Sequence, residues 1–585
     1  MKIARDLECG SLLQLFKTQP TLPLASAMQR FLCGALCCFV LACAAPSAQL
    51  PAPPRSQDVA IQGFKIAGTV VNAVTGAPLA RAKVTLADTR YRARQIATQA
   101  DETGHFEFVG LPPGKYALQG SRAGFLLSSY EQHEGYSTAI VTGPEFQTDD
   151  LVLRLMPMAM ITGHVFDESG DPVRHAAVRL FRDDHSEGIS RITPIGGAST
   201  DDRGYFDVGV LPPGTYFAEV YAKPWYAVHP FAGPRGDAAL HVSPALDVVY
   251  PITYYGGATE SDGAAPIELK GGEVQDIDFR LTPVPALHFT VHTSRENATA
   301  DGFFRMPMLS KPIFGSMENV PVGEIRPTSE GIEITGVPPG RYELRMFDPQ
   351  SKGAEQFSEV DLEHSGQELR ATQGEALGQL KVTLQPPEDE PLPHQYAIAL
   401  RDAKQTVVAW QSGKPNGEVH FELLRPGKYD IVVQSPAAQF VVRRTVSSNG
   451  ESSMGHSVNI SSGASIAVTA ELATGQVHIE GVAQKAGKPI SGIMVALVPA
   501  DPEAHVEWFR RDQSDLDGTF SLPGVVPGNY TIVAIENAWG LDWRKPGVMA
   551  RYIQHGQPLH VTEQQHGLLR LPDPVQVQTA PASAR

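Results

Sequence analysis

Hydrophobic and polar residues alternate along short stretches of this chain, a pattern that predicts β-strands with one buried face. In the segment 105–109, Phe106 and Phe108 fall on one face, while His105 and Glu107 fall on the other. The same period of two recurs in the segments 205–210, 332–334, 419–423 and 520–522. A turn and a second apolar strand follow each segment, so the pattern predicts a series of β-hairpins.

A Pro-Gly-x-Tyr tetrad opens the second strand of every predicted hairpin. The five tetrads are Pro113–Tyr116, Pro213–Tyr216, Pro339–Tyr342, Pro426–Tyr429 and Pro527–Tyr530. In four copies another glycine lies ten residues before the tetrad glycine, and in the third copy this spacing is one residue shorter. Proline fixes φ and glycine accepts a positive φ, so the tetrad suits a tight turn. Five copies at matched spacing indicate an internal repeat.

Further strands surround each hairpin and complete a repeat unit. Opening strands with a central glycine are predicted at 66–70, 161–165 and 479–483, and closing strands at 151–155 and 276–281. Each unit then has about seven short strands, enough for two sheets with a shared apolar interior. The predicted fold class is all-β, a tandem array of about five Greek-key or prealbumin-like β-sandwich domains.

The length of 585 residues is too great for one core, and the 54 Gly and 47 Pro favour short strands and tight turns. Proline-rich joints at 283–285 and 385–393 separate units by short linkers, which predicts a stiff rod. The predicted division is a signal segment 1–48, a linker 49–60, sandwiches at 61–157, 158–284, 285–386, 387–474 and 475–573, and a tail 574–585.

The N-terminal segment has the pattern of a secretory signal peptide. Arg30 is followed by an apolar run over 31–45 and then by Pro46-Ser47-Ala48. This run is shorter than the roughly 20 residues of a membrane span, so no transmembrane span is expected after signal removal. Met28 as the true start and lipoprotein processing at Cys43 are two variants. The predicted location is secreted, periplasmic or at the cell surface.

Charge and cysteine content exclude several functions. All five cysteines lie between Cys9 and Cys43, so a chain cleaved after Ala48 holds no disulfide and no thiolate metal site. The net charge is −16, and residues 1–48 carry a net +2, so cleavage leaves a chain of net charge −18. Such an acidic chain without a basic cluster repels phosphate backbones, so no nucleic acid partner is expected.

The opening glycine strand, the Gly-x-Pro turn at 76–78, the Asp-x-x-Gly turns at 101–104 and 201–204, and the Pro-Gly-x-Tyr hairpin together resemble the carboxypeptidase regulatory-like domain. This family is a transthyretin-like β-sandwich that is also grouped with carbohydrate-binding-like folds. The resemblance is fullest in units one, two and five, and units three and four keep mainly the hairpin. It implies a spacer or binding module rather than a hydrolase.

Residue patterns for catalysis are sparse. One His-x-x-Glu motif, His560 to Glu563, lies in the last predicted strand, with no room after it for a catalytic domain. No Gly-x-Ser-x-Gly elbow or phosphate loop occurs. The acidic turn 515–518 has Gln513 and Gly524 where a calcium loop needs its first and last ligands, which favours a plain turn. We therefore predict no catalytic residue, no metal site, no cofactor and no enzymatic activity.

Aromatic residues are the best candidates for ligand binding. Phe125, Trp225 and Trp539 each lie eleven residues beyond a tetrad glycine. A residue at such a repeated position either plugs the core or rim, buries a domain junction, or stacks on a pyranose ring. The candidate ligand-binding residues are Trp225, Tyr226, Tyr254, Tyr255, Trp539 and Trp543.

The sequence leads to three functional hypotheses. The first is a structural, adhesive or binding array at the bacterial cell envelope, with a polysaccharide or an envelope protein as partner. The second is a carbohydrate-binding protein that uses exposed aromatics. The third is an accessory part of a carboxypeptidase-like hydrolase. The ligand and the oligomeric state do not follow from the sequence.

Overall fold

The computed structural model describes residues 63–580, apart from 92–93, 231–241, 293–306, 329–330, 348–354, 371–374, 388–389, 436–439, 448–451 and 546. Within these residues strands dominate, which confirms the all-β prediction. The helical segments are short: η1 Ser261–Gly263, η4 Val506–Trp508 and α1 Ala550–Ile553. No helix among the described residues is long and apolar enough to cross a membrane. The predicted signal segment and linker lie outside the described residues.

Five units follow one another along the chain, and each of the first four has two main sheets. In unit one, the sheet β4-β1-β8 and the sheet β3-β2-β5-β6, to which β7 is added, enclose one core. Its strands are β1 Phe64–Asn72, β2 Lys83–Asp88, β3 Gln95–Gln99, β4 His105–Leu111, β5 Gly114–Ser121, β6 Ser128–Ser129, β7 Ile140–Thr142 and β8 Leu151–Leu155. The predicted closing strand at 151–155 is β8.

Unit two has the sheets β12-β9-β17 and β11-β10-β13-β15, with β18 added to β9 and β16 added to β13. A separate pair, β14 with β19, lies at its end. The strands are β9 Ala159–Phe166, β10 Ala177–Asp184, β11 Arg191–Ser199, β12 Tyr205–Leu211, β13 Gly214–Tyr221, β14 Val248–Val249, β15 Thr253–Tyr254, β16 Ile267–Leu269, β17 Val274–Asp276, β18 Phe279–Arg280 and β19 Val284–Pro285.

Unit three has the sheets β23-β24-β20-β27 and β22-β21-β25-β26-β28. Its strands are β20 Leu287–His292, β21 Met308–Ile313, β22 Ser316–Asn319, β23 Glu324–Pro327, β24 Gly331–Val337, β25 Gly340–Phe347, β26 Glu355–Leu362, β27 Gln367–Arg370 and β28 Glu375–Ala376. Unit four has the sheets β32-β29-β37-β34-β35 and β31-β30-β33-β36. Its strands are β29 Gly378–Gln385, β30 Ala397–Arg401, β31 Val407–Ser412, β32 Glu418–Leu424, β33 Gly427–Gln434, β34 Phe440–Ser447, β35 Ser452–Met454, β36 Ser457–Ile460 and β37 Ser465–Thr474.

Unit five joins its two layers into one sheet, because its last strand, β46, pairs with both β38 and β43. The strands are β38 Val477–Lys485, β39 Lys488–Pro489, β40 Met494–Pro499, β41 Arg510–Gln513, β42 Thr519–Val525, β43 Gly528–Glu536, β44 Gln557–Val561, β45 Gly567–Arg570 and β46 Val575–Thr579. This pairing corrects the expected tail at 574–585, since β46 is part of the sheet.

The same topology recurs in all five units. The first strand of each unit pairs antiparallel with the first hairpin strand and parallel with a closing strand, as β1 does with β4 and β8. Units three and four repeat this arrangement through β20 and β29, although their first halves carry little of the sequence pattern. Because β29 pairs with β32 and β37, residues 378–385 belong to unit four, which corrects the predicted boundary at 386.

Each hairpin buries its apolar face in its own unit. Phe106, Phe206, Phe421 and Phe520 are at most 2% exposed and lie in four different core clusters. The tetrad tyrosine completes the hairpin, because its hydroxyl donates a hydrogen bond to the carbonyl four residues earlier. This bond occurs in every unit, at 2.5 to 2.9 Å, from Tyr116, Tyr216, Tyr342, Tyr429 and Tyr530. The tyrosines therefore bury their rings without leaving a polar group unpaired.

A left-handed residue lies four positions before each tetrad glycine, where the pairing with the first strand shifts register. Its φ is between 62° and 72° in all five units. Units one, three and five have glycine there, at Gly110, Gly336 and Gly524, but units two and four have Val210 and Leu423. In unit one the positive φ thus falls at Gly110 rather than at the tetrad glycine.

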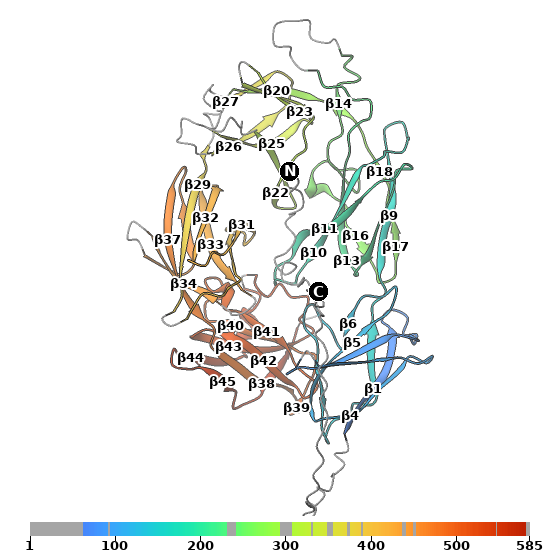
Figure 1. Cartoon of the computed structure of the whole chain (residues 1–585), viewed down its shortest axis with the longest axis vertical. Coiled ribbons are helices and arrows are strands. Elements are labelled where there is room, and N and C mark those ends of the chain that lie inside the picture. The colour runs from blue at the N-terminus through green and yellow to red at the C-terminus, as the bar shows by residue number, and fades with distance from the viewer. Residues whose placement is uncertain are drawn as a thin grey trace, which may run out of the picture.

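The units follow a closed path, and unit five lies against unit one (Figure 1). Hydrogen bonds join residues of these two units that are about 375 positions apart in sequence, such as Gln513 to Thr138. Unit five also contacts unit two, where the backbone N–H of Arg544 donates to the Gly188 carbonyl. The expectation of a stiff rod is therefore wrong, because the end units bury surface against each other.

We predict that Val210→Gly stabilises unit two by about 1 kcal/mol, because a β-branched residue is strained at φ 64° and glycine is not. Val210 is 65% exposed, so the change removes little packing. Hydrogen exchange of the amides in β9, β12 and β13 measures the effect. The control Val109→Gly, at a residue that is 67% exposed and lies in a strand, should instead destabilise unit one. Equal destabilisation by both changes would contradict the proposed backbone strain at Val210.

Candidate functional site

Trp225 lies on the surface of unit two, in the loop after β13, and is 86% exposed. The Ala227 backbone N–H donates to the Pro224 carbonyl at 3.1 Å, which closes the turn that carries the tryptophan. Its ring meets the ring of Tyr226 edge to face, with 5.6 Å between the centroids. A large exposed aromatic face on an ordered turn can contact a ligand directly.

Glu168 holds the tyrosine beside Trp225. The Tyr226 hydroxyl donates to Oε1 of Glu168, and the buried Tyr250 hydroxyl donates to Oε2 at 2.8 Å. Burial raises the pKa of Tyr226 to about 12, and the bond to Glu168 acts in the same direction. Burial acts to raise the pKa of Glu168, but the hydrogen bonds outweigh it and the pKa is lowered. We call Trp225, Tyr226 and Glu168 the Trp225 patch.

The two other candidate tyrosines of unit two lie mainly inside the molecule. Tyr254 is 1% exposed and packs with Phe181 and Ile313, which brings units two and three together. Tyr255 is partly buried against the core of unit two, with its ring edge to face with Phe279. A ligand in solvent cannot reach Tyr254, whose ring is used in the junction.

Trp539 occupies the same repeat position as Trp225 but lies in the junction between units one and five. Its ring stacks on the His133 imidazole at a centroid distance of 5.1 Å and an angle of 5°. Tyr136 lies on the same ring at 5.6 Å, and the indole N–H donates to the Gly492 carbonyl at 3.3 Å. Trp539 therefore helps to bury a domain junction, which is one of the three roles predicted for this position.

Trp543 is 8% exposed and contacts a residue of unit two. A Cβ added at Gly188 would lie 2.2 Å from the indole, so only glycine leaves room for it. The Arg511 guanidinium lies 4.6 Å from the Trp543 ring centroid. Arg511 also donates to the Glu134 carboxylate at 2.8 Å and to the Ser186 carbonyl at 3.0 Å. Arg511 therefore ties unit five to units one and two at once.

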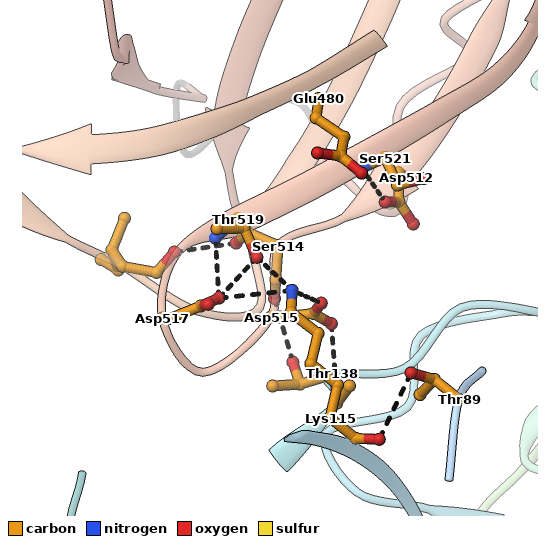
Figure 2. Close-up of polar contacts among 12 residues, drawn as sticks. Thr89, Lys115, Thr138, Glu480, Asp512, Ser514, Asp515, Asp517, Thr519 and Ser521 are labelled. Carbon is orange, nitrogen blue, oxygen red and sulfur yellow. Dashed lines mark hydrogen bonds and ion pairs between the residues drawn. The ribbon is translucent and has the colours of Figure 1, made fainter. Parts of the chain in front are cut away.

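The acidic turn 515–518 of unit five forms the polar centre of the junction (Figure 2). Lys115 of unit one places its Nζ 2.5 Å from Oδ2 of Asp515 and 3.6 Å from Oδ1 of Asp517, and it also donates to the Thr519 hydroxyl. The Ala139 backbone N–H donates to Oδ1 of Asp515 at 2.9 Å. Burial raises the pKa of the Asp515 carboxyl, although Lys115 opposes this shift.

Leu516 adds an apolar contact at the tip of this turn. Its side chain packs against the core of unit one, and its backbone N–H donates to the Ala139 carbonyl at 3.1 Å. Beside it, the Gln513 amide donates to the Glu131 carbonyl at 2.6 Å and to the Thr138 hydroxyl at 2.9 Å. The junction thus combines apolar burial with hydrogen bonds and an ion pair, as stable interfaces do.

The first aspartate of the Asp-x-x-Gly turn has different partners in different units. In unit one, Oδ1 of Asp101 accepts hydrogen bonds from the backbone N–H groups of Thr103 and His105 at 2.8 and 2.9 Å. Asp201 does the same in unit two. In unit five the equivalent Asp515 turns its carboxylate to Lys115 and Ala139 instead. The repeat motif has become a docking element there.

One serine and histidine pair lies near the junction. Ser521 Oγ is 2.7 Å from Nε2 of His478, while Glu480 approaches the same nitrogen at 3.9 Å. A catalytic histidine needs its acid on the other ring nitrogen, and among the described residues no acid within hydrogen-bonding distance lies there. The pair therefore lacks the geometry of a hydrolytic triad.

The His-x-x-Glu motif does not converge on a metal. His560, in β44, places Nδ1 2.7 Å from the Asn529 side-chain oxygen. Glu563 pairs instead with Arg443 of unit four at 2.8 Å. The two side chains serve separate surface contacts, so the motif supports no zinc chemistry here.

Sequence reasoning missed the residues of unit one that contact unit five. Lys115 is the variable residue of the first tetrad, and His133, Tyr136 and Thr138 lie in the segment between β6 and β7. Their partners are almost 400 residues away, and no local pattern marks them. The only sequence signal is the aromatic at the repeated position, which left the role of Trp539 open.

Residues 65–147 match the family model of the carboxypeptidase regulatory-like domain, which confirms the resemblance for unit one. Among solved structures, the Bacillus anthracis TIE protein shares 14% identity over 71% of this chain and 69% of its own, with a TM-score of 0.16. GBS52, the minor pilin of Streptococcus agalactiae, shares 11% identity over 38% of this chain and 97% of its own, with a TM-score of 0.20. BcpA, the major pilin subunit of Bacillus cereus, shares 11% identity over 54% of this chain and 99% of its own, with a TM-score of 0.13. At such TM-scores these similarities carry no functional argument, and no curated protein matches the chain.

We predict that the stability of unit five depends on Asp512, which accepts the Ser521 backbone N–H at 2.6 Å. Burial raises the pKa of Asp512 to about 6 in the folded protein. A raised pKa favours the folded state at low pH, so wild type should gain roughly 2 kcal/mol relative to Asp512→Asn as pH falls from 7 to 4. Hydrogen exchange in β38 and β42 at several pH values measures this. A difference between wild type and Asp512→Asn that does not change with pH would contradict the shift.

Proposed function

We propose that this protein is an exported, non-catalytic scaffold of the bacterial cell envelope, in which five β-sandwiches are held in a fixed arrangement. The single observation that carries the proposal is the docking of the 515–518 turn on unit one. A linear chain of sandwiches would hold its surfaces at variable distances. A closed chain keeps them in place, which suits a structural or adhesive role toward a polysaccharide or an envelope protein.

The absence of catalysis is part of this proposal. Among the described residues, the serine and histidine pair at Ser521 lacks an orienting acid, and the His-x-x-Glu residues point to different partners. The signal pattern of the sequence supports export. Peptide hydrolysis by the pure protein would contradict the non-catalytic role.

We predict that Leu516→Asp opens the closed arrangement, because it places a charge against the core of unit one. A compact chain of this length has a radius of gyration of roughly 25 Å. Small-angle scattering of wild type should give a radius that exceeds this value by no more than about one third. The variant should give a clearly larger radius. Leu568→Asp, at a residue that is 51% exposed in the same unit, is the matched control and should leave the radius unchanged. An extended wild-type particle would overturn the proposal.

A second candidate function is carbohydrate binding, and the Trp225 patch favours it. Flat aromatic faces bury the C–H surface of pyranose rings while the sugar hydroxyls stay in water. Trp225 is 86% exposed and rests beside a tyrosine that Glu168 holds in place. Glu168 adds an acceptor that can bind sugar hydroxyls next to the ring.

We predict that Trp225→Ala weakens retention on an insoluble polysaccharide about tenfold, which corresponds to about 1.4 kcal/mol of lost contact. Pull-down on cellulose, chitin and peptidoglycan sacculi measures retention. Tyr91→Ala removes another aromatic, which is 60% exposed and lies in unit one, and should have no effect. If wild type is retained by none of the three polymers, or Trp225→Ala is retained equally well, the carbohydrate function is refuted while the scaffold proposal stands.

A further inference from the structure

Two histidines and an aspartate meet where unit two joins unit three. His229 and Asp247 come from the last part of unit two, and His288 lies in β20, the first strand of unit three. One ring nitrogen of each histidine and a carboxylate oxygen all lie within 4.8 Å of one another. The side chains are only 15%, 21% and 16% exposed. Imidazole nitrogen and carboxylate oxygen are ligand types that zinc accepts in proteins.

The donor atoms are close to the spacing of a metal coordination sphere. Nδ1 of His229 lies 3.1 Å from Oδ1 of Asp247, and Nε2 of His288 lies 2.8 Å from Oδ2. Zinc binds imidazole nitrogen and carboxylate oxygen at about 2.0 to 2.2 Å, which puts neighbouring ligand atoms roughly 3.3 Å apart in a tetrahedron. Nδ1 of His229 and Nε2 of His288 also lie 3.1 and 2.9 Å from the same oxygen, Oδ1 of Asp247, so both nitrogen–oxygen distances are within about half an ångström of this spacing.

The backbone around the three residues fixes them before any ion binds. The Val228 N–H donates to the Leu246 carbonyl at 2.8 Å, which sets the neighbouring His229 and Asp247 side by side. The Ala286 N–H donates to the Asp247 carbonyl at 2.9 Å, and β14 pairs with β19 next to it. These bonds connect the segment that holds Asp247 to the strand that holds His288, so few side-chain rotations remain to be fixed on binding.

Two glycines of unit three make room for the His229 ring. A Cβ added at Gly323 or at Gly336 would lie 2.8 Å from ring atoms of His229, which is closer than a side chain can approach. The imidazole of unit two therefore enters a gap in unit three that only glycines leave open. The site is thus formed by both units and needs both of them in place.

We propose that His229, Asp247 and His288 bind a divalent transition metal ion, with zinc as the expected ion, and that this ion clips unit two to unit three. Two imidazoles and one carboxylate are ligands that suit zinc and leave a fourth position for water. No cysteine takes part, so the ion is bound by donors that an oxidising envelope leaves intact. The role is structural, because binding closes the joint between two units rather than a substrate pocket.

The test uses the tag-free full chain, dialysed against zinc and then against buffer, with zinc per chain measured by plasma mass spectrometry. Wild type should keep one zinc more than His229→Gln and His288→Gln, and zinc affinity should fall at least about 100-fold in each variant. Glutamine keeps a polar side chain in place, so folding is preserved, which hydrogen exchange of units two and three checks. Any zinc bound by the N-terminal cysteines is common to all chains and cancels in the comparison.

His164→Gln is the matched control, since His164 also lies beside two aspartates, Asp276 and Asp278, but has no second histidine. It should keep the wild-type zinc content. Cobalt(II) added to wild type should give the strong visible absorption of a four-coordinate site, which His288→Gln should lose. Equal zinc content and equal cobalt spectra in wild type and His288→Gln would overturn the proposal and leave a hydrogen-bonded triad only.

Discussion

The arrangement of the whole molecule depends on the contact between the acidic turn of unit five and unit one. Lys115 meets Asp515 at 2.5 Å, and Leu516 packs on the core of unit one beside them. An exposed ion pair would contribute little, but Asp515 is largely removed from water here and its second oxygen accepts the Ala139 N–H. Separating Lys115 from Asp515 would leave a buried charge unpaired, so this contact strongly favours the closed arrangement.

A single hairpin design makes all five units, and small changes at its ends give each unit its role. The tyrosine hydroxyl bond to the carbonyl four residues earlier is present in every unit, so the hairpin itself is constant. The loops beside it differ. The repeated aromatic position is exposed as Trp225 in unit two, whereas in unit five Trp539 stacks on His133. Function is therefore to be sought in the loops and junctions and not in the cores.

Local sequence patterns predicted the hairpins well because strand alternation and turn chemistry act over a few residues. The alternating burial of β4 and the closing strand β8 follow directly from Phe106, Phe108 and the run 151–155. The closed path could not be predicted in this way, since Lys115 and Asp515 are 400 positions apart and their motifs, the first tetrad and the acidic turn, predict only local turns. Proline-rich joints suggested a rod, but joints fix only neighbouring units. For the same reason His229, Asp247 and His288 have no recognisable spacing and were not predicted to bind a metal.

The most direct test of the closed arrangement is a disulfide engineered between units one and five. Ala139 and Leu516 share a backbone hydrogen bond of 3.1 Å, so Ala139→Cys with Leu516→Cys places two thiols close together. Mild oxidation of a chain that begins at Gln49, and so lacks the five native cysteines, should give a monomer with one intramolecular disulfide, found by mass spectrometry of non-reduced peptides. Free thiols after oxidation, or disulfides only between two chains, would contradict the account.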